Sequence, residues 1–528
     1  MKVHFVYPIL DSPPGINHGL AALSGVLRAA GHRTRLLQVS EALPPVPGID
    51  EAVARVLAWK PDLVGLSVLT QQYGWARRFA AALKGQAPGL PLVVGGVHCT
   101  MVPEEVARDG LAEKLWDYIC LGEGEEALAR LCSALEEGRP VEAIPNLILL
   151  GEGKVRRNPV GPFPDLAGLP PKDYDLFDMP RITAAKKGWI SILTSRGCPY
   201  RCTYCFNREI VRLYREEGAI TGPAAYLRRY PIERIIAELR RLRAGLGGLE
   251  MVIFDDDLFT LDQRYVIDFC RAYREAGIGL PFVVNAHPQS FDREMAAALA
   301  AAGCTIVKFG IESGSPRVRR EVLHRPMGNG RIAAALAAAH ACGLHTSAFI
   351  MLGLPTESMA EIGETLQLCV DVEVGRFRWA IFYPFPGTMA SRIARERDLV
   401  DPAKEAALGG NYFDSSCLRF SPEQDLLIEK LAVLCPWYVN ARGRWECAGL
   451  YGDLVREVEA MDRESFAAAK EELVARDREI SEDLIRRGLP HYSLRFSRVM
   501  GVHSEYVVWE RRQREQQVRV PGRDYTLE

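Results

Sequence analysis

The 528-residue sequence lacks the features that would place a protein in a membrane or on nucleic acid. Its longest clean apolar run, PLVVGGV at residues 91–97, is far shorter than the roughly 20 residues of a membrane span. The first residues, MKVHFVYPIL, read as a strand and not as the apolar stretch and cleavage site of a signal peptide. A net charge of −2 supplies no basic field for nucleic acid or anionic lipid. We therefore expect a cytoplasmic protein with no membrane span and no nucleic-acid partner.

The 13 cysteines are an odd number in a long chain, which favours reduced thiols over a disulfide framework. Three of them, Cys198, Cys202 and Cys205, fall within eight positions of SRGCPYRCTYCFN, with no fourth cysteine and no histidine nearby. A closed zinc site usually takes four nitrogen or sulfur ligands in short-spaced pairs. Chance clustering of buried cysteines does not suit the surrounding arginine, proline and tyrosine. An iron–sulfur cluster held by thiolates fits better than either alternative, and three ligands would leave one iron open.

Before these cysteines, short apolar runs alternate with helical segments, which is typical of βαβ units around a parallel sheet. The expected strands are residues 3–9, 32–39, 62–69, 91–96 and 117–122. They predict a doubly wound α/β domain over residues 1–150 with its ligand beyond the carboxyl ends of the strands.

Small residues gather at those predicted strand ends. They are Ser67, Gly95, Gly96, Gly122 and Gly124, the last two in the stretch GEGE. Glycine lets a ligand approach the backbone closely, and the following helix N-termini offer N–H groups to phosphate. Any one glycine pair could be ordinary loop chemistry, but three such turns on one sheet edge favour a ligand with a nucleotide tail.

The remainder of the chain divides into three further parts. A proline-rich linker is expected at residues 151–185, lying over a surface. Residues 186–398 then repeat strand and helix six times and predict a partial (β/α)6 barrel, with reactive groups at the C-terminal strand ends. The expected barrel strands begin at residues 189, 249, 281, 305, 345 and 376. Residues 399–528 are mostly helical and form a third domain.

The cysteine spacing, on a loop directly after the first barrel strand, resembles the signature of the radical S-adenosylmethionine (radical SAM) superfamily. The resemblance implies a 4Fe-4S cluster held by Cys198, Cys202 and Cys205, with S-adenosylmethionine on the open iron. One electron from an external flavodoxin- or ferredoxin-type reductant would cleave S-adenosylmethionine to the 5′-deoxyadenosyl radical. It also implies S-adenosylmethionine contacts from Tyr204, Asp256, Glu312 and Ser313. Glu357 and His287, at other strand ends, could be structural or functional.

The order of the two α/β domains, with PPG, GGVH and GEGE after strands of the first, resembles the cobalamin-binding (class B type) radical SAM subclass. On that resemblance the tail of cobalamin lies on Ser67, Gly95, Gly96, Gly122 and Gly124. The Asp-x-His-x-x-Gly motif that supplies a cobalt ligand in other cobalamin domains is absent. His18 lies near where that motif would sit and is the alternative candidate for the cobalt ligand. We nevertheless expect no protein nitrogen on cobalt, because such a donor makes the Co(I) state harder to reach.

The subclass implies a cobalamin-dependent methyltransferase acting on an unactivated carbon or phosphorus of a small molecule or biosynthetic intermediate. The alternative is cyclisation or rearrangement without methyl transfer. A sensor that carries both cofactors without turnover is a third hypothesis, which the strand-end carboxylates disfavour. No catalytic residue is assigned from the sequence, and no residue distinguishes methylation from cyclisation.

Overall fold

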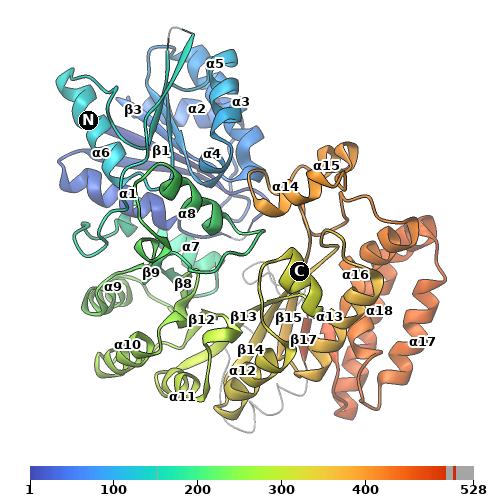
Figure 1. Ribbon diagram of the computed structural model, residues 1–528. Coiled ribbons are helices and arrows are strands. Elements are labelled where there is room, and N and C mark those ends of the chain that lie inside the picture. Colours follow the sequence, from blue (N-terminus) through green and yellow to red (C-terminus); the bar gives the residue numbers. More distant parts are fainter. Residues whose placement is uncertain (13, 152, 495–503, 507–528) are drawn as a thin grey trace.

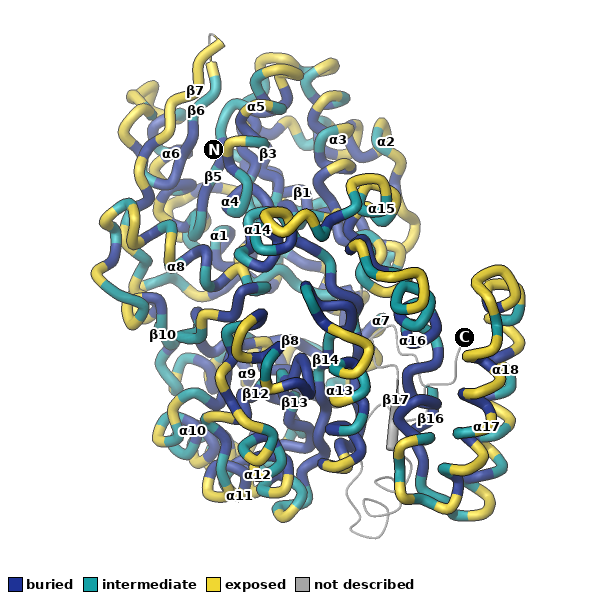
Figure 2. The backbone as a smooth tube through the Cα atoms, turned by 45° about the vertical axis from the view of Figure 1, so that its right-hand side comes forward, coloured by how far each residue is buried: buried dark blue, intermediate teal, exposed yellow. Residues whose placement is uncertain are grey.

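The structure, a computed structural model, describes residues 1–12, 14–151, 153–494 and 504–506. Figure 1 shows two sheets, one above the other, each flanked by helices, with a bundle of helices beside the lower sheet. Most of the strands are buried, and the exposed residues lie mainly on the outer helices and loops, as Figure 2 shows. The mixed α/β architecture predicted from the sequence is confirmed.

The first sheet has seven strands in the order β2-β1-β3-β4-β5-β6-β7. Strands β1 to β5 are parallel, and β6 and β7 continue the sheet antiparallel. The strands are Lys2–Pro8, Arg33–Val39, Leu63–Ser67, Leu92–Gly95, Tyr118–Cys120, Leu147–Gly151 and Lys154–Arg157. The helices between them are α1 (His18–Ala29), α2 (Ile49–Ala58), α3 (Tyr73–Gln86), α4 (Val97–Met101), α5 (Pro103–Glu113) and α6 (Glu125–Glu137). All five predicted strands are present.

The expected linker differs from the prediction. Its first residues form β7, an edge strand whose four residues are all exposed, so its sequence carries no apolar pattern to announce it. Further along, Tyr174 and Phe177 are buried, and helix α7 (Met179–Ala185) follows. The Asp173 carboxylate accepts a hydrogen bond from Ser24 of α1 at 2.6 Å. This segment therefore packs into the core, because its prolines set turns between apolar side chains that still bury.

The second sheet is open and fully parallel, in the order β15-β14-β13-β12-β11-β8. Its strands are β8 (Trp189–Ile192), β11 (Met251–Phe254), β12 (Phe282–Ala286), β13 (Cys304–Glu312), β14 (His345–Leu352) and β15 (Arg376–Ile381). The helices of this part are α8 (Phe206–Glu216), α9 (Ile232–Gly245), α10 (Gln263–Glu275), α11 (Arg293–Ala301), α12 (Asn329–Ala341), α13 (Met359–Asp371) and α14 (Met389–Glu396). A two-stranded ribbon, β9 (Ser195–Arg196) with β10 (Arg228–Arg229), interrupts the first unit. The six predicted barrel strands are thus present as a half-barrel.

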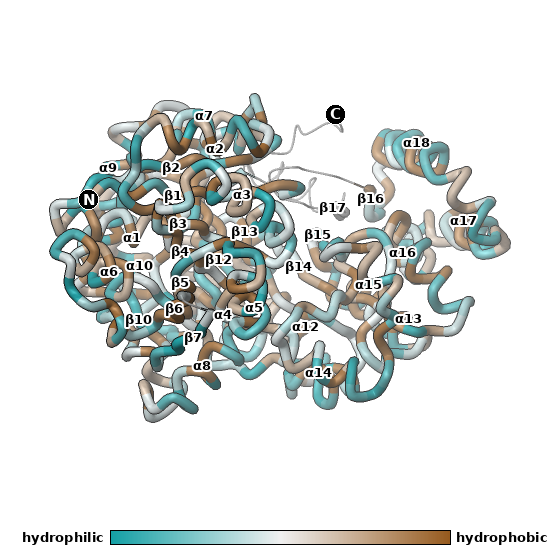
Figure 3. The backbone as a smooth tube through the Cα atoms, turned by 90° about the horizontal axis from the view of Figure 1, so that it is seen from above, coloured by the Kyte–Doolittle hydropathy of each residue, from teal (hydrophilic) through white to brown (hydrophobic). Residues whose placement is uncertain are grey.

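The C-terminal part contains α15 (Pro402–Leu408), α16 (Pro422–Asn440), α17 (Ala448–Glu459), α18 (Arg463–Arg487) and a ribbon of β16 (Tyr492–Leu494) with β17 (Ser504–Tyr506). Trp437 is fully buried and donates to Asp477 at 2.7 Å, so it fills a core. The Tyr492 hydroxyl donates to the Val374 carbonyl at 2.8 Å, which docks this part beside β15. Figure 3 shows its helices to one side of the two sheets. None of the helices described is both long and apolar enough to cross a membrane.

Candidate functional site

The loop that carries the three cysteines is held at its start by Asp256, which follows β11. Its carboxylate accepts hydrogen bonds from the Thr194 backbone N–H at 3.2 Å, from the Thr194 hydroxyl at 2.7 Å and from the Ser195 hydroxyl. Asp256 is fully buried, and burial raises its pKa. The side chain predicted to contact S-adenosylmethionine is therefore engaged in positioning the cysteine loop.

The middle of the loop is tied to two later segments. Thr203, between the second and third cysteines, is fully buried, and its hydroxyl donates to the Val322 carbonyl at 2.6 Å. Its N–H donates to Leu323 O at 3.1 Å, and its own carbonyl accepts from the Ala390 N–H at 2.9 Å. Cys205 then caps the start of α8. The irregular part of the loop that follows β9 thus has a defined position.

The three thiols are unpaired with other cysteines and differ in burial. Cys202 is buried, and Cys198 and Cys205 are partly buried. Among the residues described, no three His, Cys, Asp or Glu side chains converge to hold a single metal ion. In a cluster each thiolate can bind a different iron. Burial raises the pKa of the Cys198 thiol to about 12, and neighbouring acidic groups, Cys202 among them, add to that rise. Cluster binding must therefore displace protons from these thiols.

Arg325 is a site residue that the sequence did not reveal. It lies in the loop after the turn at 318–322, and its guanidinium donates to Cys202 Sγ at 3.4 Å, to the Tyr204 hydroxyl at 3.3 Å and to the Gly310 carbonyl. The arginine therefore places a buried positive charge beside the second cysteine. A single arginine in a loop carries no recognisable spacing, so only the fold could place it here.

Glu312 and Tyr204 lie with Arg325 at the end of β13. Glu312 is buried, adopts a positive φ of 68° at a bulge in the strand, and turns its carboxylate back over Gly310. Burial raises its pKa, while the guanidinium of Arg325 acts in the opposite direction. Strained backbone of this kind marks functional positions. The structure thus brings Cys202, Tyr204 and Glu312 together around Arg325, and the contact of Tyr204 and Glu312 with S-adenosylmethionine stays a prediction.

The other strand-end residues have different surroundings. Ser313 is fully buried, and its hydroxyl lies 3.3 Å from the Thr365 hydroxyl and accepts from Ser315 N. His287 stacks on Tyr200 of the cysteine loop with ring centroids 3.9 Å apart, and burial lowers its pKa to about 2. Glu357 accepts from Leu354 N in its own turn, and burial raises its pKa to about 8. These groups shape the loops around the site.

At the facing edge of the first sheet, the GEGE turn binds protein. Glu123 accepts from Arg196 at 2.7 Å and from Arg228 at 3.0 Å, and Glu125 accepts from Arg196 at 2.6 Å. The two arginines are cross-strand partners in the β9–β10 ribbon, and Arg196 lies two residues before Cys198. The pKa of Glu123 is lowered because the two guanidinium groups outweigh its burial. This turn clamps the cysteine loop to the first domain.

Gly122 packs against Tyr214 of α8. A Cβ at this glycine would lie 2.2 Å from the Tyr214 hydroxyl, and its φ is +63°. That hydroxyl accepts from Glu123 N at 3.1 Å and from Asn146 at 3.0 Å. A glycine is therefore needed at position 122 to make room for Tyr214, whether or not a ligand binds at this turn. Gly124 likewise lies against Cys120 Sγ.

The end of β4 is different, because the atoms nearest to a Cβ on Gly95 or Gly96 belong to the first domain. Ser67 and Gly95 are register partners at the ends of β3 and β4. Asn17, the N-cap of α1, donates to the Ser67 hydroxyl at 3.0 Å. A Cβ on Gly95 would make only ordinary contacts of 3.4 Å with Cys120. Gly96, with φ +101°, closes on the Val68 backbone, so its freedom is needed by the turn.

His18 lies at the first turn of α1 and faces the second domain. Its Nε2 is 3.8 Å from the carboxylate of Asp255, the residue after β11. Asp255 has a pKa lowered to about 2, since His18, Lys308 and Lys186 together outweigh its burial. The two strand-end surfaces therefore face each other at this point.

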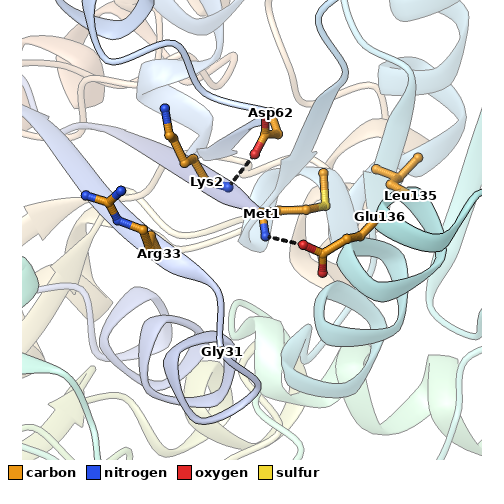
Figure 4. A pocket seen from close by; sticks show the side chains of 7 residues that line it. All are labelled: Met1, Lys2, Gly31, Arg33, Asp62, Leu135 and Glu136. Atoms are coloured by element: carbon orange, nitrogen blue, oxygen red, sulfur yellow. Dashed lines mark hydrogen bonds and ion pairs between the residues drawn. The ribbon is translucent and has the colours of Figure 1, made fainter.

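A surface hollow exists elsewhere, at the amino ends of the first sheet's strands (Figure 4). There Met1 N donates to Glu136 at 2.9 Å and Lys2 N donates to Asp62 at 2.7 Å. It lies at the opposite end of the strands from the cysteines and has no part in the site.

Comparison with known proteins agrees with this geometry. Residues 192–369 match the radical SAM superfamily and residues 13–132 match the B12 binding domain. The chain is 28% identical over 396 residues to an uncharacterized methyltransferase of Pyrococcus horikoshii, covering 74% of this chain and 82% of that protein. It is 25% identical to the anaerobic magnesium-protoporphyrin IX monomethyl ester cyclase of Rubrivivax gelatinosus, covering 73% and 68%.

Among solved structures, the cobalamin-dependent S-adenosylmethionine radical enzyme OxsB, with aqua-cobalamin and S-adenosylmethionine bound, has the same fold. The TM-score is 0.66 at 17% identity, over 89% of this chain and 75% of that one. A radical SAM domain uses a 4Fe-4S cluster and S-adenosylmethionine, and a B12 domain binds cobalamin, so these are the three cofactors of the chain. The chain thus joins a B12 binding domain and a radical SAM domain in one polypeptide, the two domains of the cobalamin-binding radical SAM enzymes that its sequence resembles.

Proposed function

We propose that the protein is a cobalamin-dependent radical SAM methyltransferase that acts on a carbon or phosphorus centre of a small molecule. The observation that carries this proposal is the apposition of two strand-end surfaces. The cysteine loop with Arg325 and Glu312 belongs to one surface, and Ser67 with Gly95 belongs to the other. The similarity to a methyltransferase over most of both chains supports methyl transfer.

In this proposal Cys198, Cys202 and Cys205 hold the cluster as thiolates. The Arg325 guanidinium, 3.4 Å from Cys202 Sγ, stabilises the charge of that thiolate. Asp256 and Thr203 hold the loop so that the thiols keep their spacing without reorganisation. The cofactors, when bound, supply the radical and the methyl group.

Glu312 and Tyr204 orient S-adenosylmethionine at the end of β13. Glu312 is positioned by its bulge and by the neighbouring guanidinium, so its oxygens can accept hydrogen bonds from a ligand amine or hydroxyl. Ser67, Gly95 and Gly96 would receive the cobalamin tail. We assign the electron donor to the class of flavodoxin- or ferredoxin-type carriers.

The direct test uses the anaerobically reconstituted protein. We expect one 4Fe-4S cluster, reductive cleavage of S-adenosylmethionine to 5′-deoxyadenosine, and transfer of a labelled methyl group to cobalamin. The Cys198→Ala/Cys202→Ala/Cys205→Ala variant should hold no cluster by iron and sulfide analysis. A full cluster in that variant would contradict the assignment of the ligands.

A cyclase is the second candidate, since the similarity to the Rubrivivax gelatinosus protein covers nearly as much of the chain. The two candidates differ in the fate of the methyl group. A methyltransferase moves label from S-adenosylmethionine to cobalamin and then to product. A cyclase forms 5′-deoxyadenosine while label stays off both, and that result would favour the cyclase.

A further inference from the structure

The inward face of the half-barrel carries a row of polar residues below the cysteine loop. The strand register aligns Asn285, Lys308, Ser347 and Arg376 on β12, β13, β14 and β15. Two residues further along, Gly310, Phe349 and Arg378 form the next row toward the strand ends. Because side chains alternate along a strand, both rows point to the same face of the sheet.

Partial exposure distinguishes part of this face from the opposite face of the sheet. Along β13, Val307, Phe309 and Ile311 are buried against the helices, whereas Lys308 and Gly310 between them are partly exposed. On β14 and β15 the alternation starts one row higher: Phe349 and Arg378 are partly exposed, whereas Ser347 and Arg376 are buried. Deeper on the inward face, a separate apolar cluster closes the floor: Trp189, Met251, Ile253, Val283 and Ile306. The inward face is thus accessible above and closed below.

The accessible rows carry an excess of positive charge. Within the part of the chain that the structure describes, neither the Lys308 ammonium nor the Arg378 guanidinium has a hydrogen bond or ion pair with another side chain. The guanidinium lies 5.4 Å from the ring centroid of Phe349. Lys186, which donates to Ser191 at 3.0 Å, adds a third cation. Asp255 is the neighbouring acid, and it also faces His18.

These cations affect one another. Burial lowers the pKa of Lys308 to about 8, and the charges of Arg378, Arg376 and Lys186 act in the same direction, against Asp255. Uncompensated charge in a desolvated site is costly and is retained where a counter-charge binds. Lys308 lies four residues before Glu312, about 13 Å deeper along the strand at roughly 3.3 Å per residue. It is therefore separated from the end of the barrel where Arg325 and the cysteines lie.

We propose that Lys308 and Arg378 bind an anionic group of the substrate, a carboxylate or a phosphonate or phosphate, on the inward face of the half-barrel. The inference rests on the proposed function, because it takes the barrel interior as the substrate site. Phe349, the register partner of Arg378 and one row nearer the strand ends than Lys308, then offers its ring to the body of the substrate. The planar guanidinium of Arg378 can donate two parallel hydrogen bonds to two oxygens of either acid.

The test measures binding of small probes to the reconstituted protein by calorimetry or saturation-transfer nuclear magnetic resonance. The probes are phenylacetate, phenylphosphonate and the neutral phenylacetamide. We expect at least one acid to bind, and the amide to bind at least tenfold more weakly. Which acid binds decides between carboxylate and phosphonate. Equal binding of the amide and the acids would overturn the proposal.

Two variants assign the effect to these side chains. Lys308→Met/Arg378→Met should weaken acid binding at least tenfold, and Lys308→Gln alone should weaken it in a smaller step, which keeps the test usable if the double variant misfolds. Lys154→Met/Arg156→Met, on the exposed strand β7, is the matched control and should bind like wild type. Unchanged acid binding in both Lys308→Met/Arg378→Met and Lys308→Gln contradicts the proposal.

Further measurements separate this proposal from the proposed function. If Lys308→Met/Arg378→Met loses S-adenosylmethionine or cobalamin binding together with acid binding, the two cations serve a cofactor. That result would overturn the proposal. Probe binding needs no turnover. If methyl label never leaves S-adenosylmethionine while the acids still bind through Lys308 and Arg378, the methyltransferase assignment fails and the anion site stands.

Discussion

Two turns at one sheet edge, GGVH after β4 and GEGE after β5, each contain two glycines but have different partners. The β5 turn donates a hydrogen bond to a tyrosine of the second domain and accepts hydrogen bonds from two of its arginines. The β4 turn meets no side chain of that domain at Gly95. A glycine-rich strand end can therefore serve a ligand or a domain contact, and the glycines alone do not say which.

Breaking the charge clamp of the β5 turn should have the largest effect. Glu123→Gln leaves Arg196 and Arg228 partly uncompensated in a buried site, which costs about 3–5 kcal/mol of unfolding free energy. Urea unfolding of the apoprotein measures it. Glu126→Gln, on the exposed side of α6 beside Arg130, is the control and should change little.

The same carboxylate gives the clamp a pH dependence. The pKa of Glu123 is lowered in the folded protein, so its contribution is present above the ordinary carboxyl pKa and is lost as pH falls through the folded-state value. We expect Glu123→Gln to flatten the acid side of the stability–pH curve. An unchanged acid limb would show that the clamp does not couple to folding.

Next in size is Gly122→Ala. The added Cβ collides with the Tyr214 hydroxyl at a positive φ, and the cost is about 3 kcal/mol. Gly138→Ala separates the two causes, since Gly138 has φ +65° and no atom near its Cβ position, so only the backbone cost of about 1 kcal/mol applies. Equal losses of unfolding free energy in Gly122→Ala and Gly138→Ala would show that the contact with Tyr214 is not the cause.

Gly95→Val should show the opposite behaviour. The Cβ has room and the φ is not positive, so stability should stay near wild type while cobalamin affinity falls at least tenfold, or about 1.4 kcal/mol. Spectroscopic titration of cobalamin measures the affinity, and cluster content is the internal control. Gly96 is unsuitable for this test because any side chain there meets the Val68 backbone. Full cobalamin binding by Gly95→Val would make the β4 turn ordinary loop structure.

The smallest effect is expected for His18→Ala. His18 is directed toward Asp255, and we predict that it does not ligate cobalt. The electron paramagnetic resonance spectrum of the bound Co(II) form should show no nitrogen splitting in wild type or variant. Splitting that disappears in the variant would identify His18 as the ligand.

The residues of the three-aspartate run show why only part of the site could be predicted. Strand β11 and its end were readable from an apolar run followed by Asp255, Asp256 and Asp257. Which carboxylate faces which partner depends on residues far along the chain: Thr194 binds Asp256, Gly197 N donates to Asp257, and His18 faces Asp255. Sequence spacing cannot order contacts that arise from packing three separate segments.

The sequence by itself determined the strand and helix order, the two α/β units and the cysteine spacing, because these depend on periodicity and on neighbours within a few residues. The tertiary structure decided that Arg325 reaches Cys202, that Tyr214 fills the turn at Gly122, and that Lys308 and Arg378 share an accessible face. Each of these contacts joins residues from different elements, most of them distant in sequence. Their proximity follows from how the sheets and helices pack, and no local pattern encodes it.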